Sequence, residues 1–389
     1  MTSTTPTPVS RAGHVRVTSH YHNGHTHVER HPPSVLNNEP RRRRVSIYWD
    51  DMPRLILVAA SHHSKRARAA LPQLLTYLQS LPDVLVAADT AVLSLCPPGT
   101  PAVRSTTDHD PELARTSYDA SEVDLVVCLG GDGLIFHVLH RYFPTRVPPF
   151  VPFNMGSLGF LTPFDFASFR QHISSILRGA NNTVTVRMRL KCVVQRCEKR
   201  TACVHNFEHN VLHDGPARQT EEFHALNEMV IDRGPAPYLS NLEVLADDCP
   251  VTRVQADGLI VATPTGSTAY SLSSGGSMVH PNVPAILFTP ICPHSLSFRP
   301  VLFPDHVTLQ IKVPSDSRAT AWVSFDGRHR MELMKGDKVI VTVSPWSVPT
   351  FSKTDTTNDW FTSVSQCLRW NERVTQGAAD SDCEKDGKL

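Results

Sequence analysis

Apolar residues in the first half of the chain form continuous runs that alternate with segments of helical periodicity. These runs and segments follow one another at 55–60, 62–80, 123–129, 134–142 and 149–153. Continuous apolar runs are typical of strands buried on both faces, and the segments between the first runs have the spacing of helices. The order strand, helix, strand, helix, strand predicts an α/β domain with a parallel sheet over residues 54–183.

Beyond residue 184 the pattern changes to short β-like runs separated by turn residues. The runs lie at 184–186, 190–194, 225–232, 242–245, 258–262, 307–313, 320–325 and 338–343. Because few helical segments intervene, we expect a β-rich, β-sandwich-like domain over residues 184–340. Residues 196–221 are expected to be an insertion between two of its strands.

Both ends of the chain lack apolar periodicity, so residues 1–53 are predicted to be a disordered tail and residues 377–389 a frayed end. Six of the twenty histidines lie in the N-terminal segment. A metal site needs rigidly held ligands, and nothing in this segment supplies rigidity. We therefore interpret the segment as a solvated tail whose composition is biased toward histidine. The insertion carries cysteine and histidine at a spacing that fits no standard zinc finger: Cys197, Cys203, His205, His209 and His213.

Length and composition narrow the class of protein. The 389 residues predict two or three folded units, and 40% hydrophobic with 19% charged residues is ordinary for a globular chain. The balance of 38 Lys+Arg against 37 Asp+Glu argues against a general nucleic-acid binder. We expect no membrane-spanning helix and no secretory signal, since no apolar run is long enough. The nine scattered cysteines indicate a reducing compartment, the cytoplasm.

The first candidate site is the turn Gly130-Gly131-Asp132-Gly133, which follows the 123–129 strand and opens a helix. Ligands bind at this edge of α/β sheets, where glycines and a helix N-terminus favour phosphate. The carboxylate of Asp132 would repel phosphate, but it suits a role in accepting a hydroxyl proton or holding a metal ion. The turn predicts phosphoryl transfer, and a turn in which Asp132 only caps the helix is the alternative.

The second candidate site follows the 258–262 strand. Asp257 precedes that strand, and ten of the positions from Thr263 to Gly276 are Gly, Ser or Thr. Such a loop offers backbone donors, hydroxyl groups and one aromatic ring, Tyr270, that can stack on a base; a tight turn with local hydrogen bonds is the alternative. A third signal, Asn227-Glu228 at the mouth of a strand, suits a diol or an amide ligand.

Taken together and in this order, the three segments resemble the NAD kinase family, and the eukaryotic cytosolic branch in particular. The resemblance covers most of residues 120–375. The GGDG turn is shared with diacylglycerol kinases, sphingosine kinases and phosphofructokinases, whereas the Asn-Glu pair and the TPTGSTAY loop are typical of NAD kinases. The resemblance implies the NAD kinase/diacylglycerol kinase-like fold: a Rossmann-like α/β domain, a β-rich domain, and a segment 341–376 that returns to the first domain.

The resemblance also implies a reaction, in which Asp132 takes the proton of the 2′-hydroxyl of the adenosine ribose of NAD while ATP, with Mg²⁺, donates phosphate. Gly130, Gly131 and Gly133 would shape the phosphate turn. The implied NAD-binding residues are Asp132, Gly133, Asn227, Glu228, Asp257, Thr265, Thr268, Ala269, Tyr270 and Ser273. Asp326, Gly327 and Arg328 match a segment near the site whose roles stay open.

The resemblance further implies a homo-oligomer, a dimer or tetramer, and small-molecule substrates; we expect no metal site built from the chain alone. One departure is Leu134, which stands directly after the GGDG turn where the family usually has Thr, Asn or Ser. Two alternatives stay open. Leu134 suggests a catalytically silent NAD-binding module, and the shared GGDG turn suggests a lipid kinase.

Overall fold

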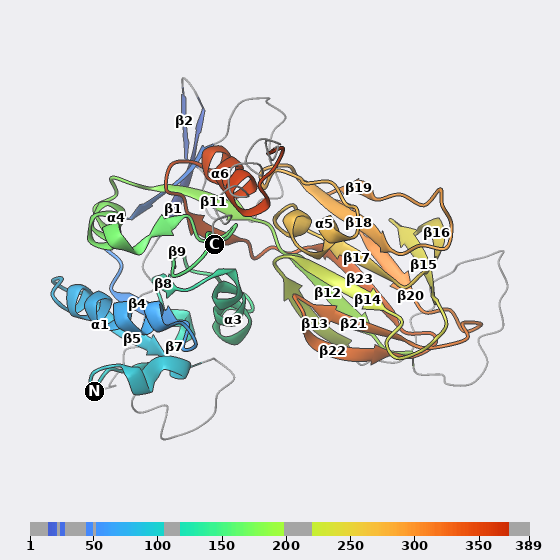
Figure 1. Cartoon of the computed structure of the whole chain (residues 1–389), viewed down its shortest axis with the longest axis horizontal. Coiled ribbons are helices and arrows are strands. Elements are labelled where there is room, and N and C mark those ends of the chain that lie inside the picture. The colour runs from blue at the N-terminus through green and yellow to red at the C-terminus, as the bar shows by residue number, and fades with distance from the viewer. Residues whose placement is uncertain are drawn as a thin grey trace, which may run out of the picture.

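The computed structural model describes residues 15–21, 24–27, 44–49, 52–104, 117–197 and 220–372, which form two parts (Figure 1). The first part is a 12-stranded sheet with helices on its faces, and the second consists of two six-stranded sheets. The blue and green elements on the left of Figure 1 belong to the first part, and most of the yellow and orange strands on the right belong to the second. This architecture confirms the predicted fold class.

The large sheet is mainly parallel at its centre, where β9, β8, β4 and β5 run in one direction. Its strands are β1 (Val15–Tyr21), β2 (Gly24–His27), β3 (Arg44–Trp49), β4 (Leu55–Ala60), β5 (Leu85–Asp89), β6 (Ala102–Arg104), β7 (Ser117–Asp119), β8 (Leu125–Leu129), β9 (Phe150–Asn154), β10 (Phe164–Asp165), β11 (Thr183–Arg187) and β24 (Val348–Phe351). Their order is β2-β1-β3-β11-β24-β9-β8-β4-β5-β6-β7, with β10 beside β9. The carboxyl ends of the parallel strands therefore meet at one edge, where a site is expected.

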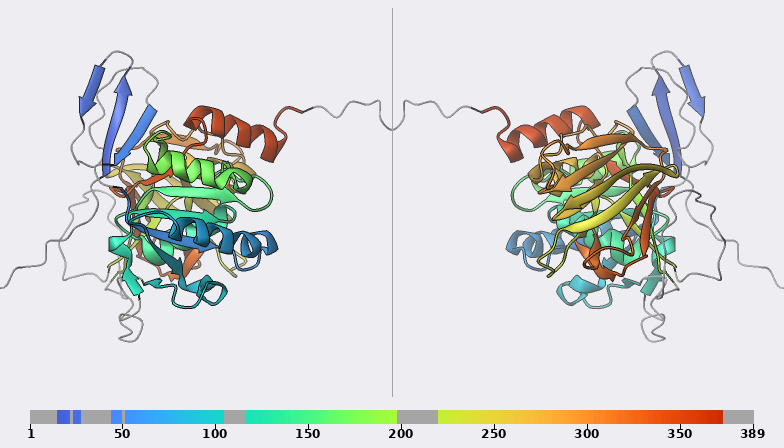
Figure 2. Two further views of the ribbon diagram at one scale, coloured as in Figure 1. Left: turned by 90° about the vertical axis from the view of Figure 1, so that its left-hand side faces the viewer. Right: turned by 90° about the vertical axis from the view of Figure 1, so that its right-hand side faces the viewer.

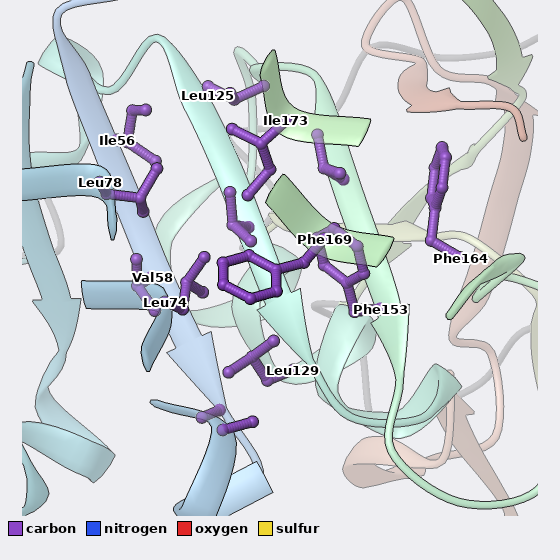
Figure 3. Close-up of a cluster of buried hydrophobic side chains, with 14 of the residues drawn as sticks. Ile56, Val58, Leu74, Leu78, Leu125, Leu129, Phe153, Phe164, Phe169 and Ile173 are labelled. Atoms are coloured by element: carbon purple, nitrogen blue, oxygen red, sulfur yellow. The ribbon is translucent and has the colours of Figure 1, made fainter. Parts of the chain in front are cut away.

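Helices cover both faces of this sheet, which explains the continuous apolar runs. The helices are α1 (Lys65–Gln79), α3 (Asp132–Tyr142) and α4 (Phe169–Leu177). Ile56 and Val58 of β4 belong to the core cluster with α1 and α4, whereas Leu55 and Leu57 belong to the cluster with α3. Figure 3 shows the first cluster, with Leu74, Leu78, Phe169 and Ile173 packed over the strands. Alternate side chains of one strand are thus buried on opposite faces.

Helix α1 runs through a proline without ending there. Ser64 caps its start, since its hydroxyl accepts a hydrogen bond from the N–H of Ala67 at 3.3 Å. Pro72 lies inside the helix, and Leu71, Leu74 and the other apolar residues of the buried face are held against the sheet on both sides of it. Packing of that face therefore outweighs the hydrogen bond that Pro72 removes.

The prediction of a disordered tail over residues 1–53 is wrong for β1, β2 and β3, which extend the large sheet. β3 pairs antiparallel with β11, with Val45 opposite Val184. Ile47 is only 1% exposed, and the indole N–H of Trp49 donates to the carbonyl of Ile176 at 2.9 Å. Apolar Val45, Ile47 and Trp49 alternate with period two, but the alternation is short and follows an arginine run, so the sequence alone does not distinguish this strand from a tail.

The second part is built only from antiparallel pairs, in two sheets that enclose one core. One sheet contains β13 (Thr220–Ala225), β12 (Leu190–Gln195), β23 (Lys338–Val343), β20 (Leu309–Lys312), β15 (Ser240–Ala246) and β16 (Cys249–Ala256) in this order. The other contains β19 (Val301–Pro304), β18 (Ala285–Ile291), β17 (Gly258–Ala262), β14 (Glu228–Asp232), β21 (Ala321–Phe325) and β22 (Arg328–Leu333). Of the expected insertion, residues 198–219 lie outside the described chain, and with them Cys203, His205, His209 and His213.

The chain returns to the first part at its C-terminal end. β24 pairs with β11 antiparallel and with β9 parallel, so it lies inside the large sheet. Helix α6 (Thr356–Leu368) follows, and it lies beside the junction of the two parts (Figure 1). The same red helix lies near the top of both views in Figure 2. In the part of the chain that the structure describes, no helix is long and apolar enough to cross a membrane.

Candidate active site

Asp132 is the first residue of α3, directly after the turn that follows β8. Its carboxylate accepts two backbone hydrogen bonds, from the N–H of Phe160 at 3.0 Å and from the N–H of Leu161 at 3.1 Å. Both donors belong to the segment that leads from β9 to β10. The carboxylate is therefore held in one orientation at the edge of the sheet where the parallel strands end.

The surroundings of Asp132 are close-packed. A Cβ atom on Gly159 would collide with the carboxylate oxygen Oδ1, so only glycine permits this approach. Burial raises the pKa of Asp132, although the two backbone N–H groups and the nearby Arg187 oppose the rise. Arg187 is itself 8% exposed, and its Nε donates to the hydroxyl of Thr350 at 3.1 Å. A carboxylate in such surroundings is a stronger proton acceptor than a solvated one.

The glycine turn is crowded on one side and open on the other. A Cβ on Gly130 would lie 2.9 Å from Cδ2 of Leu134, whereas none on Gly131 or Gly133 would meet another atom within 4 Å. Leu134 is partly buried and packs on the cluster beneath α3. The structure therefore gives Leu134 a packing role against the turn and leaves the faces of Gly131 and Gly133 free for a ligand.

Asn227 and the loop after β17 are brought together by backbone contacts. The N–H of Thr263 donates to the carbonyl of Asn227 at 2.8 Å, and the hydroxyl of Thr263 donates to the carbonyl of Leu226 at 2.6 Å. A Cβ on Gly266 would collide with the backbone of Asn227. The second and third sequence signals thus form one constellation, in which the short 3₁₀ helix Thr265–Thr268 lies against the Asn-Glu pair.

Asp326 holds that constellation from the opposite side. Its carboxylate accepts hydrogen bonds from three successive backbone N–H groups, of Leu226 at 2.7 Å, Asn227 at 2.8 Å and Glu228 at 3.1 Å. Asp326 and Gly327 have φ of +48° and +69° and form the two-residue turn between β21 and β22, a conformation that Asp-Gly favours. Asp326 therefore contributes to the site through the backbone that it fixes.

Glu228 is the most perturbed carboxyl group of this region. It is 8% exposed, and among the described residues its Oε2 has no hydrogen-bond partner. Burial raises the pKa of Glu228 to about 8, and the charge of Asp326 adds to the rise, whereas the backbone of Tyr270 opposes it. In the free protein Glu228 is therefore largely protonated at neutral pH and can donate a hydrogen bond as well as accept one.

Most of the remaining predicted residues lie on the segment around Tyr270, a residue that is 44% exposed. Burial raises the pKa of Tyr270, and so do the nearby carboxylates of Asp232 and Asp257. Asp257 pairs with Arg233 at 2.9 Å on the half-exposed surface. Thr265 is buried, Thr268 and Ala269 are half-buried and Ser273 is exposed, and all four lie on the segment that carries Tyr270. Arg328 is exposed and begins β22, on another hairpin.

Sequence reasoning missed three contributors to the site. Gly159 makes room for Asp132, Arg187 supplies a buried positive charge, and His140 on α3 lies 3.1 Å from Asp326. Gly159 had a signal, since it lies in a glycine-containing segment just after a buried strand. Arg187 and His140 act across elements that are distant in sequence, so no local pattern points to them.

An α/β domain with a GGDG turn at its carboxyl edge, followed by two packed antiparallel sheets, defines the NAD kinase/diacylglycerol kinase-like class of proteins. Two family models match the sequence: the ATP-NAD kinase N-terminal domain over residues 85–181 and the ATP-NAD kinase C-terminal domain over residues 226–352. Putative NAD kinase 3 of Oryza sativa subsp. japonica is 38% identical over 357 residues, which cover 90% of this chain and 68% of the relative. The chain therefore belongs to the NAD kinase family.

Two further comparisons extend this result. The crystal structure of yeast NADH kinase complexed with NADH has a TM-score of 0.70 and 31% identity, over 86% of this chain and 92% of that one. Probable NAD kinase 2, chloroplastic, of Oryza sativa subsp. japonica is 44% identical over 351 residues, which are 89% of this chain and 33% of the relative. The chain thus spans about a third of the length of this chloroplastic relative.

Proposed function

We propose that this chain is an NAD kinase, which transfers the terminal phosphate of ATP to the 2′-hydroxyl of the adenosine ribose of NAD and forms NADP. The observation that carries the proposal is the carboxylate of Asp132, held by two backbone N–H groups at the N-terminus of α3 in a chain of this family. A ribose hydroxyl is a weak nucleophile at neutral pH, so a positioned base is what the reaction requires.

Asp132 acts in this proposal as the base that takes the hydroxyl proton. Its raised pKa still leaves it an acceptor, and the two N–H bonds fix which oxygen lone pairs face the substrate. General-base catalysis by a positioned side chain contributes about 10²–10⁴-fold. Alignment of the hydroxyl with the phosphate would supply much of the remaining acceleration.

NAD is proposed to lie along the constellation of Asn227, Glu228 and the loop that carries Tyr270. The exposed ring of Tyr270 offers a face for stacking on a base. The buried Oε2 of Glu228, without a partner among the described residues, is a polar atom that a ribose hydroxyl or an amide of NAD would satisfy. Asp257, beside Tyr270, would bind an amine or carboxamide edge.

ATP is proposed to place its phosphates at the open faces of Gly131 and Gly133, next to the first turn of α3. Bound Mg²⁺ would neutralise charge on the phosphates during transfer. No group of three His, Cys, Asp or Glu side chains suited to a metal ion occurs within the described residues. Mg²⁺ would enter with the nucleotide, since Mg²⁺ keeps water and phosphate ligands and needs only one or two carboxylates.

The proposal is tested by incubating the full chain with NAD, ATP and Mg²⁺ and measuring NADP, for the wild type and for Asp132→Asn. We expect the substitution to lower kcat by about 10²-fold or more while NAD binding is kept. A wild type that forms no more NADP than Asp132→Asn would overturn the proposal. Running NADH beside NAD, and polyphosphate beside ATP, identifies the preferred acceptor and donor.

The same assay separates the two alternatives. A silent NAD-binding module would bind NAD in calorimetry without turnover, and a lipid kinase would phosphorylate a sphingoid base or diacylglycerol. The names of the relatives favour neither, since they are NAD and NADH kinases.

The expected homo-oligomer and the expected cytoplasmic location stay predictions. Light scattering of the purified chain would test the first, and fractionation of cells would test the second.

A further inference from the structure

The C-terminal helix α6 contacts the segment that orients Asp132. The hydroxyl of Ser363 donates to the carbonyl of Gly159 at 3.2 Å, and the thiol of Cys367 donates to the carbonyl of Leu158 at 3.2 Å. Ser363 and Cys367 are four residues apart, so they lie on one face of the helix. Two successive carbonyl groups of the segment are therefore bound by one helix face.

The next two residues of the same segment point their N–H groups the other way. Phe160 and Leu161 donate to the two carboxylate oxygens of Asp132. The four-residue segment 158–161 thus connects α6 to Asp132, with carbonyl groups toward the helix and N–H groups toward the carboxylate.

Few other backbone hydrogen bonds hold this segment in place, although Leu161 at its end is packed in the hydrophobic core. It belongs to neither a helix nor a strand, and the described structure gives its backbone one further hydrogen bond, from Arg187 to the carbonyl of Phe160 at 3.4 Å. A small pocket lies beside the segment, lined by Phe160, Ser363 and neighbouring residues of β24 and α6. The two side chains of α6 therefore supply the backbone hydrogen bonds of Leu158 and Gly159, the half of the segment that lies outside the core.

We propose that Ser363 and Cys367 are positioning residues for the reaction, acting through segment 158–161 on the carboxylate of Asp132. The inference rests on the proposed function, in which Asp132 is the base. Without the two anchors the segment shifts, and its N–H groups hold the carboxylate less well. Because those N–H groups favour the charged form, their loosening raises the pKa of Asp132 and lowers the fraction that is ready to accept a proton.

The test compares Ser363→Ala, Cys367→Ala and the double variant with Ser365→Ala, a control on the exposed face of the same helix. Each lost hydrogen bond is expected to lower kcat about fivefold, with the KM for NAD within twofold of the wild type. The acid limb of the kcat profile moves to higher pH in the variants, and not in the control. Cys367→Ser keeps a donor and should restore the wild-type profile.

Hydrogen exchange measured by mass spectrometry provides a readout that needs no activity. Peptides covering residues 155–163 should exchange faster in the double variant than in Ser365→Ala, while peptides of the β-rich part stay unchanged. Exchange and acid limb equal to those of Ser365→Ala would overturn the inference, even in an active enzyme. A wild type that forms no NADP would instead overturn the proposed function. The exchange result would then decide only whether Ser363 and Cys367 hold segment 158–161 in place.

Discussion

The ring Nε2 of His140 lies 3.1 Å from Oδ2 of Asp326, and this contact joins the two parts of the molecule. His140 belongs to α3, the helix that begins with Asp132, whereas Asp326 holds the backbone of residues 226–228. One helix thus presents the proposed base at its N-terminus and, two turns later, contacts the residue that fixes the proposed NAD site.

Replacing Asp326 by Asn should destabilise the protein and weaken NAD binding. One of the acceptor oxygens becomes an NH₂ group, so one or two of the backbone N–H groups at 226–228 lose their partner. We expect the free energy of unfolding in urea to fall by about 2–4 kcal/mol. The matched control is Asp316→Asn in the exposed pair with Arg253, for which a change within about 0.5 kcal/mol is expected. Equal effects of the two substitutions would contradict a special role for Asp326.

Glycine at position 159 should be essential for activity in a way that glycine at 156 is not. A Cβ at Gly159 collides with the carboxylate of Asp132, whereas a Cβ at Gly156 meets no atom within 4 Å. Gly159→Ala is expected to lower kcat by about 10²-fold through displacement of the carboxylate. Gly156→Ala should stay within a few-fold of the wild type. The prediction fails if steady-state NADP formation is the same in both variants.

Glu228 should make the free protein less stable as the pH rises. Its pKa of about 8 in the folded chain lies above the ordinary value of 4.5, so the folded state binds the proton more tightly than the unfolded state. The stabilising contribution is complete below pH 4.5 and is lost as the pH rises toward and through 8. Thermal unfolding of Glu228→Gln, which carries no titrating carboxyl, should lack this part of the decline. Parallel curves for the two proteins between pH 5 and 9 would refute the prediction.

Leu134→Thr should preserve the site, although it restores the type of residue that is usual in the family. Leu134 packs on Gly130 and on the cluster beneath α3, and it makes no contact that orients Asp132. We expect a loss of about 1–2 kcal/mol in stability from the smaller side chain, with kcat changed by no more than a few-fold. A gain of tenfold or more in kcat would instead show that Leu134 limits catalysis.

The sequence predicted well what depends on local patterns. The buried strands at 55–60 and 123–129 were visible because both faces of β4 and β8 are covered by helices. The turn around Asp132 and the loop before Tyr270 were visible because their glycines and hydroxyl residues are locally dense. The place of β3 in the sheet was missed, since a strand of six residues beside an arginine run carries little signal.

What the sequence could not show are contacts between residues far apart in the chain. Ser363 and Gly159 are 204 positions apart, and Arg187 and Asp132 belong to different elements. The family resemblance points to Asp326 as a candidate. Its hydrogen bonds to the backbone N–H groups of residues 226–228 depend on the pairing of β14 with β21, which the sequence does not show. Such roles follow from topology, which a single sequence leaves open.

The position of β24 between β9 and β11 makes the middle of the large sheet depend on a strand that comes much later in the chain than its neighbours. The middle of the large sheet stays incomplete until β24 has been synthesised, and β24 follows all strands of the β-rich part in the chain, with α6 after it. A chain without β24 and α6 would therefore expose the unpaired edges of β9 and β11. The segment that orients Asp132 would also lack its hydrogen bonds to the helix.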